Sequence, residues 1–237
     1  RDYANEMADW NRVMVRYEQQ ILGLASSLHP SLHTIHQLQP GFAYGDAISN
    51  EAIQVRNWLR AAGYRSEIFA QYIDPKVSNE CRLYQSGAIS STDGLIYHHS
   101  IGSEITPVAV AHLGHKCLIY HNITPAEFLQ PYRPDLAYLL RQGREELWTL
   151  ARSFPISVGD SVYNAEELAL RGFSSPGVLP LAIDPSHWST LPDESLMRQL
   201  QDGKHNLLFV GRYAPNKCQH HLVESFAYYL TLDPDAR

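Results

Sequence analysis

Two cations follow an apolar run near the end of the printed sequence. Arg212 and Lys217 lie in VGRYAPNK, after LLFVG and before the amphipathic run CQHHLVESFAYYLTL, so we expect a strand, a short loop and a helix. A guanidinium grips phosphate oxygens in pairs, and an ammonium supplies a compact positive charge. The pair is therefore a candidate pyrophosphate site, although a solvated loop is the ordinary explanation for such residues.

Histidines gather at the ends of two other apolar runs. GLIYHHS ends in His98 and His99, shortly before Gly102, and KCLIYHNIT contains His121 and Asn122. Imidazole is a common metal ligand, so a metal site has to be considered. However, adjacent residues of a strand point to opposite faces, and neither a His-Glu-x-x-His motif nor a carboxylate at ligand spacing accompanies these histidines. We predict no metal site and regard a hydrogen-bonded structural role as the ordinary explanation for each histidine.

A glycine-containing turn, PGFAYGDAIS, precedes a helical pattern. Gly41 and Gly45 allow close backbone approach and positive φ, and a helix is expected to begin near Asp46 or Ser49. Such a turn can cradle a phosphate or serve as a plain strand-to-helix connection, and the stretch alone supports both equally. No G-x-G-x-x-G and no G-x-x-x-x-G-K-[ST] is present, so neither a nicotinamide enzyme nor a P-loop ATPase is supported.

Short apolar runs alternate with helical patterns between residues 29 and 185. The strand candidates are HTIHQLQ, YRSEIFA, GLIYHHS, KCLIYHNIT, FPISVGD and VLPLAID. The two clearest helices are SNEAIQVRNWLRAAG, ended by Gly63, and DLAYLLRQGREELWTLAR, with Asp135 as its candidate N-cap. This alternation predicts the α/β class, with a Rossmann-like parallel sheet and flanking helices. Ligands of such sheets bind at the carboxyl ends of the strands, where the candidate residues above are expected to lie.

The regions before and after this core have different patterns. Residues 1–28 carry an apolar stripe at spacings of three and four, which predicts an amphipathic helix laid against the following domain, with docking of another domain left open. Residues 186–205 are polar and turn-rich and are interpreted as a linker with one short helix before Gly203. Residues 206–237 are interpreted as the first strand and helix of a second domain. The apolar stripe of residues 1–28 consists of Tyr3, Met7, Trp10, Met14, Tyr17, Ile21 and Leu24.

Composition narrows the functional classes. The chain has 237 residues and a formal net charge of -6, without a basic tract, which argues against nucleic acid as a partner. Cys81, Cys117 and Cys218 are odd in number and widely spaced, so we expect reduced thiols. Because no apolar run approaches the roughly 20 residues of a membrane span and no signal peptide is evident, we expect a cytoplasmic protein. Since the first residue is Arg1, we expect a piece of a longer chain.

The order and spacing of these stretches resemble the N-terminal half of a GT-B glycosyltransferase of family 4, the "group 1" set of retaining transferases. The resemblance covers residues 32–237. It implies two facing Rossmann-like domains, with the acceptor-side domain over residues 29–185 and a donor-binding domain, truncated here, over residues 206–237. The most specific stretches are QPGFAYGDAISNEA, DGLIYHHSIGSE, LIYHNITP, ISVGDSVYNAEEL with VLPLAID, and LLFVGRYAPNK.

The resemblance also implies a reaction and its residues. A sugar passes from a nucleotide-sugar to a saccharide, lipid or other glycan precursor with retention, without a metal or a further cofactor. By resemblance, Arg212 and Lys217 grip the donor diphosphate and stabilise the leaving nucleotide, Gly45 and Asp46 approach the same diphosphate, and His121 reaches the transferred sugar. The implied acceptor-side residues are His98, His99, Gly102 and Asn122.

Two departures from the family pattern limit what the chain is expected to do alone. Cys218 stands where the family often has glycine or a polar residue, and the paired glutamates of the donor domain would lie beyond Arg237. We therefore expect weak or no binding of nucleotide-sugar and no turnover until the missing C-terminal half, the main expected partner, is supplied. The alternatives are a non-enzymatic binding or assembly module of a larger polysaccharide-biosynthesis protein and metal-dependent hydrolysis. Peripheral association with the inner membrane face stays open.

Overall fold

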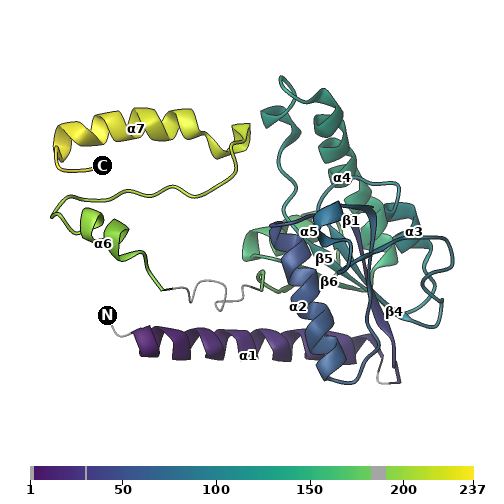
Figure 1. Ribbon diagram of the computed structural model, residues 1–237. Coiled ribbons are helices and arrows are strands. Elements are labelled where there is room, and N and C mark those ends of the chain that lie inside the picture. The colour runs from purple at the N-terminus through teal and green to yellow at the C-terminus, as the bar shows by residue number, and fades with distance from the viewer. Residues whose placement is uncertain (1–2, 30, 183–190) are drawn as a thin grey trace.

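The computed structural model describes residues 3–29, 31–182 and 191–237, with only the backbone described for residues 3–12. Its first part forms an α/β domain whose helices cover both faces of one sheet (Figure 1). The strands are β1 (Ile35–Phe42), β2 (Ile68–Ile73), β3 (Arg82–Leu83), β4 (Gly94–His99), β5 (Lys116–Tyr120), β6 (Ile156–Gly159) and β7 (Gly177–Val178). The α-helices are α1 (Tyr3–Leu28), α2 (Ala47–Ala61), α3 (Thr106–Ala111), α4 (Pro134–Ser153), α5 (Val162–Leu170), α6 (Glu194–Leu200) and α7 (Gln219–Leu232). Single 3-10 turns are η1 (Pro75–Val77), η2 (Ala126–Phe128) and η4 (Pro215–Lys217).

The sheet has the order β3-β2-β1-β4-β5-β6-β7. Every pairing between its strands is parallel, and Leu38 of β1 lies between Phe69 of β2 and Tyr97 of β4. The predicted α/β class with a Rossmann-like parallel sheet is therefore confirmed. Since the chain winds outward in one direction from β1 and in the other from β4, the strand order reverses between these two strands.

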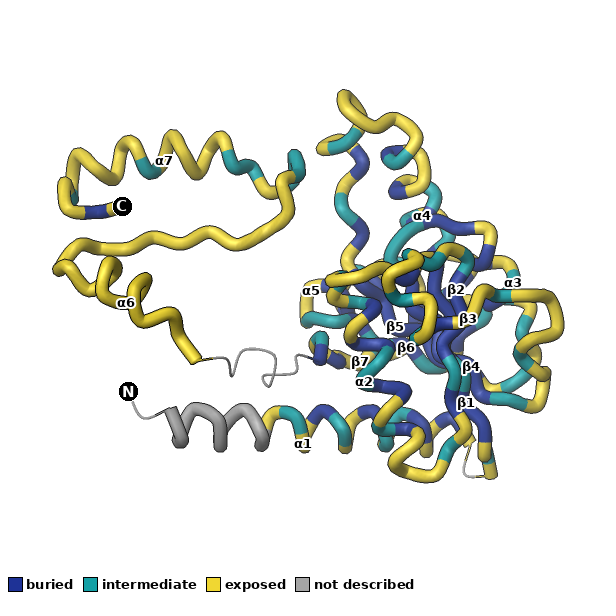
Figure 2. Tube along the Cα trace, viewed as in Figure 1, coloured by how far each residue is buried: buried dark blue, intermediate teal, exposed yellow. Residues whose placement is uncertain are grey.

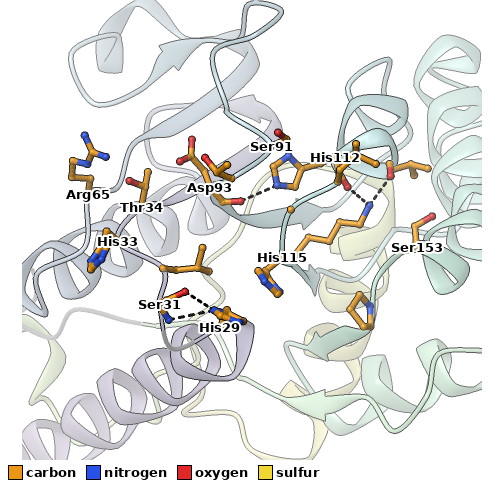
Figure 3. A pocket seen from close by; sticks show the side chains of 17 residues that line it. His29, Ser31, His33, Thr34, Arg65, Ser91, Asp93, His112, His115 and Ser153 are labelled. Atoms are coloured by element: carbon orange, nitrogen blue, oxygen red, sulfur yellow. Dashed lines mark hydrogen bonds between the residues drawn. The ribbon is translucent and has the colours of Figure 1, made fainter.

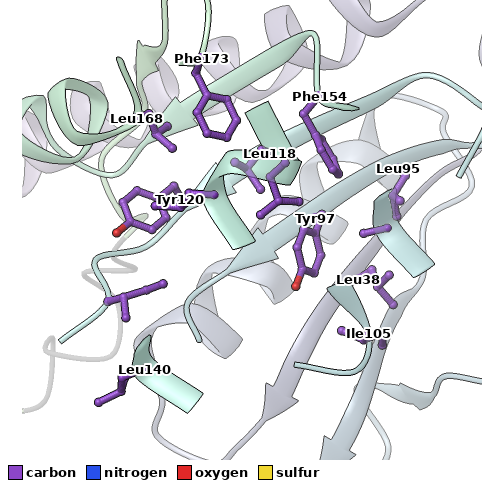
Figure 4. Packing of buried hydrophobic residues seen from close by; sticks show 14 of the residues in the cluster. Leu38, Leu95, Tyr97, Ile105, Leu118, Tyr120, Leu140, Phe154, Leu168 and Phe173 are labelled. Carbon is purple, nitrogen blue, oxygen red and sulfur yellow. The ribbon is translucent and has the colours of Figure 1, made fainter. Parts of the chain in front are cut away.

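Alternating side chains of the central strands divide the core into two layers. Leu95, Tyr97, Leu118 and Tyr120 face α3, α4 and α5, where they pack with Phe154 (Figure 4). The intervening residues face α1 and α2. That second layer contains Tyr17, Ile21, Ala25, Leu28, Ile35, Val55, Leu59, Ile96, Cys117, Ile119, Leu179 and Ala182.

The two clearest predicted helices differ in how well their start was predicted. Asp46 is the N-cap of α2 and accepts from the Ser49 backbone N–H at 3.0 Å, and Gly63 follows the helix at φ +93°. Asp135 was predicted to cap α4, and that prediction is wrong. Arg133 occupies the N-cap position, Pro134 begins the helix, and Asp135 in its first turn pairs with Arg133 at 2.7 Å. Proline has no N–H to be capped, so the helix starts one residue earlier.

The predicted N-terminal helix is confirmed as α1. Tyr17 and Ile21 are buried against α2 and the sheet, which supports packing on the following domain, whereas the side chains of Tyr3, Met7 and Trp10 lie outside the described residues. No described helix combines the length and apolar character that crossing a membrane requires.

Five of the six strand candidates between residues 29 and 185 contain half or more of a strand, and the last contributes a single strand residue. In VLPLAID only Val178 belongs to a strand, and residues 183–184 fall outside the described part. The short strand β3 was not predicted, because Arg82–Leu83 is exposed and too brief to show a period.

The C-terminal segment contains the predicted helices but not the predicted strand. The helix expected before Gly203 is α6, and the one after residue 218 is α7. LLFVG forms no strand, and the single bridge described in this segment joins His205 and Ala236. Figure 2 shows that the segment is almost entirely exposed, with Leu208 at 87% and Val210 at 82%. The domain boundaries near residues 186 and 206 stay predictions.

Candidate functional site

The carboxyl edge of the sheet, next to the reversal between β1 and β4, concentrates the candidate residues. After β1 the chain turns through Gly45, whose φ is +71°, into the N-terminus of α2. His98 lies at the end of β4, and His121 directly follows β5. In open α/β sheets the loops diverge at such a reversal and leave a crevice for a ligand. The fold therefore confirms that these residues gather at one edge.

Two histidines meet on the face of the sheet covered by α1 and α2. His98 Nδ1 lies 3.1 Å from His121 Nε2, with ring centroids 5.3 Å apart and ring planes 9° apart. On its other side, His98 Nε2 lies 2.9 Å from Gln37 Oε1, and the Gln37 amide donates to the Ala52 carbonyl at 2.9 Å. The bond to Ala52 fixes the orientation of the Gln37 amide, so the Gln37 oxygen faces His98 and has to accept a hydrogen bond from the Nε2–H of His98. The free lone pair of His98 is on Nδ1, directed at His121.

A buried carboxylate completes the cluster. Glu51 of α2 is 1% exposed, and its Oε2 lies 3.7 Å from His121 Nε2 and 4.0 Å from His98 Nδ1. That oxygen has no hydrogen-bond partner among the described residues. Burial raises the pKa of the Glu51 carboxyl to about 7, while His121 and the Ala182 backbone N–H act in the opposite direction. Two imidazoles and one carboxylate thus converge on a single point, where they can hold a cation or share a proton.

Burial and neighbouring charged groups shift the pKa values of residues in and around the cluster. Burial lowers the pKa of His98 well below its usual value, and proximity to His121 lowers it further, so this ring is neutral. Asp160, after β6, places Oδ2 3.8 Å from His121 Nδ1. Burial also raises the pKa of Tyr17, and Glu51 and Asp160 add to that increase. Helix α1 therefore contributes a side chain to the neighbourhood of the site.

Sequence analysis missed Glu51, Gln37 and Tyr17 as members of this cluster. One signal was available, because Glu51 is in line with Val55 and Leu59 at spacings of four on the buried face of its helix. A charged residue among apolar helix positions indicates a buried polar site. Gln37 carried no such signal in isolation.

His99 and Gly102 serve the opposite face of the sheet. His99 Nε2 donates to the Gly143 carbonyl of α4 at 2.9 Å, and burial lowers the pKa of His99 to about 4. A Cβ at Gly102 would lie 2.6 Å from the Leu139 carbonyl oxygen. The expectation that His98 and His99 point apart is confirmed. Both His99 and Gly102 dock α4 here, and their acceptor contact stays a prediction, as does that of the exposed Asn122.

Arg212 and Lys217 are not brought to this edge. Both are exposed, and the contacts among the described residues connect neither of them with Gly45 or His121. Their segment lies apart from the sheet in Figure 1. Cys218, between this loop and α7, adopts a left-handed conformation with φ 51°. Glycine is favoured in that conformation, so Cys218 occupies a backbone position that residues with a Cβ rarely adopt.

An open groove lies at the opposite, amino edge of the sheet (Figure 3). It encloses about 870 Å³, and His29 and His115 stack in it with centroids 4.6 Å apart. Two of its other polar groups are already bonded: His112 Nε2 donates to the Asp93 carbonyl at 3.0 Å, and Lys116 donates to three carbonyl oxygens. Because ligands of such sheets bind at the carboxyl edge, we regard this groove as secondary.

Comparison with protein-family models finds no match, and comparison with curated proteins finds none either. The functional interpretation therefore depends on the residues and their geometry.

Proposed function

We propose that the chain forms the acceptor-side domain, and the beginning of the donor-binding domain, of a retaining GT-B glycosyltransferase that uses a nucleotide-sugar. The observation that carries the proposal is the position of Gly45 and His121 beside the strand reversal. Gly45 lets the backbone approach a diphosphate at the N-terminus of α2, where helix N–H groups favour an anion. The Asp46 carboxylate already caps that helix, and its approach to the diphosphate stays a prediction.

The exposed C-terminal segment supports a second lobe. Residues 207–210 place apolar side chains in solvent, and Tyr213 is 96% exposed. Exposed apolar residues in a row mark a surface that another element covers. Neighbouring strands of a donor-binding domain would cover this one and would place Arg212 and Lys217 at the carboxyl end of a strand, facing the first domain across a crevice.

In the proposed reaction the two domains divide the work. Arg212 binds diphosphate oxygens bidentately and Lys217 adds a point charge, so that the negative charge developing on the leaving nucleotide is stabilised. His121 lies on the acceptor side near the transferred sugar. The acceptor hydroxyl attacks the anomeric carbon on the face that the nucleotide leaves, the bond between that carbon and the diphosphate oxygen breaks, and the hydroxyl proton passes to the departing diphosphate. The configuration is thereby retained.

The test uses the full-length natural polypeptide that contains residues 1–237. Purified protein is incubated with UDP-, GDP- and ADP-sugars together with saccharide and lipid acceptors, and release of the nucleoside diphosphate is measured. We expect release from one of them, reduced about 100-fold or more in Arg212→Ala with Lys217→Ala, in line with the loss of charge-stabilising donors. Arg198→Ala, which removes an exposed cation of α6, is the control and should keep wild-type activity. No release from any sugar nucleotide, or full activity in the double variant, would overturn the proposal.

A further inference from the structure

We propose that Glu51, His98 and His121 bind one divalent transition-metal ion, for which Zn²⁺ fits best. The inference goes beyond the proposed function and does not depend on it. Sequence analysis predicted no metal site, because no carboxylate stands at ligand spacing from either histidine. The fold supplies that carboxylate from α2, and one ligand atom of each residue lies within 4.8 Å of the other two.

The three donor atoms form a triangle of suitable size for one ion. His98 Nδ1, His121 Nε2 and Glu51 Oε2 are separated by 3.1, 3.7 and 4.0 Å. The circle through three points at these separations has a radius of about 2.1 Å, and Zn²⁺ binds imidazole nitrogen and carboxylate oxygen at about 2.0–2.2 Å. An ion near its centre lies at bonding distance from all three donors, and a modest rotation of the two rings, whose Nδ1 and Nε2 face each other, turns their lone pairs toward it.

The hydrogen bonds around His98 leave the lone pair of its ring on Nδ1, the atom that faces His121 and forms one corner of the triangle. Gln37 holds the Nε2–H of His98 through its side-chain oxygen, and its own amide is held by the Ala52 carbonyl. Histidines that bind metals donate their second ring N–H to such a partner, which fixes the tautomer. His98 is thus already oriented as a ligand through Nδ1.

His121 has its second nitrogen facing a carboxylate. With Nε2 on an ion, the proton of this ring is on Nδ1, which faces Asp160 Oδ2 at 3.8 Å. Without an ion, the neutral ring has to donate from Nε2 to His98 and therefore turns the lone pair of Nδ1 toward the Asp160 carboxylate. An imidazolium would remove that conflict, but it would leave Glu51 Oε2 beyond hydrogen-bonding distance of both rings.

The unpartnered Glu51 oxygen is a separate observation that supports a bound cation. Its side chain is almost fully buried, and Oε2 has no hydrogen-bond partner among the residues that the structure describes. A buried carboxylate is strongly destabilising unless an opposite charge or hydrogen bonds compensate it. A cation at the centre of the triangle supplies that charge.

The donor set indicates the class of ion. Two imidazoles and one carboxylate are the protein ligands of many zinc sites that keep a fourth position open, and the same set also binds iron, manganese and cobalt. In the proposed transferase, Arg212 and Lys217 stabilise the diphosphate, so this ion is not required there. It positions His121 through Nε2 and leaves Nδ1–H on the Asp160 side, so both proposals can hold together.

The experiment measures Zn²⁺ binding by the metal-free 237-residue chain with isothermal titration in the presence of a competing chelator. We expect one tight equivalent per chain, lost in His98→Gln and in Glu51→Gln. His99→Gln is the matched control, because it removes the adjacent buried histidine that faces α4, and it should keep the tight equivalent. Weak binding by exposed histidines, such as the His29 and His115 pair, is common to all these proteins and cancels in the comparison.

A second set of measurements covers the case in which a buried variant fails to fold. Asp160→Asn changes a partly exposed residue next to His121 and should weaken Zn²⁺ binding about 10–100-fold, as loss of an outer carboxylate does. Co²⁺ added to the wild-type chain should give the intense visible absorption of a four- or five-coordinate ion. A folded wild-type chain without a tight equivalent, or equal Zn²⁺ affinity in the wild type and a folded Glu51→Gln variant, would overturn the proposal.

Discussion

His98 at the end of β4 and His121 just after β5 meet edge to edge, with ring planes 9° apart and Nδ1 and Nε2 3.1 Å apart. The parallel register explains the contact: His98 of β4 pairs with Ile119 of β5, and His121 lies two residues further along the same face. Neither histidine is placed by its own sequence neighbours. The pair exists because β4 and β5 are adjacent in the sheet and because α2 brings Glu51 over them.

Substitution of Gly143 tests the close contact between α4 and the loop after β4. A Cβ at this position would lie 2.5 Å from the Gly102 backbone nitrogen, so Gly143→Ala should destabilise the fold by about 1–3 kcal/mol, although alanine favours a helix by about 1 kcal/mol. Gly23 of α1 is the matched control, because nothing lies within 4 Å of its added Cβ. Urea unfolding should show Gly23→Ala to be neutral or stabilising. Equal effects of the two substitutions would refute the close approach.

Substitution of Gly45 tests the left-handed turn beside the strand reversal. Its φ of +71° is unfavourable for any residue with a Cβ, so Gly45→Ala should cost about 1 kcal/mol in the free energy of unfolding. Gly41→Ala is the control: its φ is not positive, and space for a Cβ is free at both positions. Thermal unfolding should therefore separate the two variants. A Gly45→Ala protein as stable as Gly41→Ala would contradict the left-handed turn.

Substitution of Lys116 tests the role of a buried cation at the C-terminal end of α3. Its ammonium donates to the carbonyl oxygens of Ala109, Val110 and His112 and lies 5.0 Å from the centre of the Phe154 ring. Lys116→Met should lower the free energy of unfolding by roughly 2 kcal/mol, because three carbonyl groups lose a charged donor.

The control for that substitution is Lys76→Met. Lys76 is exposed, and loss of an exposed lysine usually changes stability by less than about 0.5 kcal/mol. If chemical denaturation gives the same midpoint for Lys116→Met and Lys76→Met, the three hydrogen bonds contribute nothing.

His36 predicts a loss of stability in acid. Its Nδ1 accepts from the Glu67 backbone N–H at 3.1 Å, and burial lowers the pKa of His36 below 6.5, although Asp93 and Glu67 oppose this and Arg65 and Arg82 assist it. The folded state thus favours the neutral ring. The stabilisation that comes from the neutral His36 ring is present above pH 6.5 and is lost as the pH falls through 6.5 toward the folded-state pKa.

The measurement compares unfolding of the wild type with that of His36→Asn between about pH 7.5 and about pH 5.5, a range that spans the unperturbed histidine pKa. Asparagine keeps an acceptor near the Nδ1 position and does not titrate, so the wild type should lose more stability, by about 1 kcal/mol for the hydrogen bond. Parallel pH profiles would show that His36 is not held neutral by the fold.

The sheet was predictable from the sequence because its signals are local. GLIYHHS and KCLIYHNIT are short apolar runs, and their alternation with amphipathic helices dictates parallel pairing. The opposite orientations of His98 and His99 followed from the period of two. The strand expected at LLFVG did not form, because a strand needs a neighbour and the described residues offer none there.

The cluster at the carboxyl edge was only partly predictable. His98 and His121 were found from their places at the ends of runs, whereas Glu51, Gln37 and Tyr17 come from elements that only the tertiary fold brings together. The placement of Arg212 and Lys217 opposite Gly45 was expected from resemblance and stays a prediction, because local sequence carries no information on how distant segments face each other.

A crystal structure of the full-length natural polypeptide soaked with a nucleoside diphosphate tests the account most directly. We predict that the diphosphate binds at the carboxyl edge, with the Gly45 turn on one side and Arg212 and Lys217 on the other. A diphosphate bound instead in the amino-edge groove beside His29 and His115, or no bound diphosphate at saturating concentration, would contradict it.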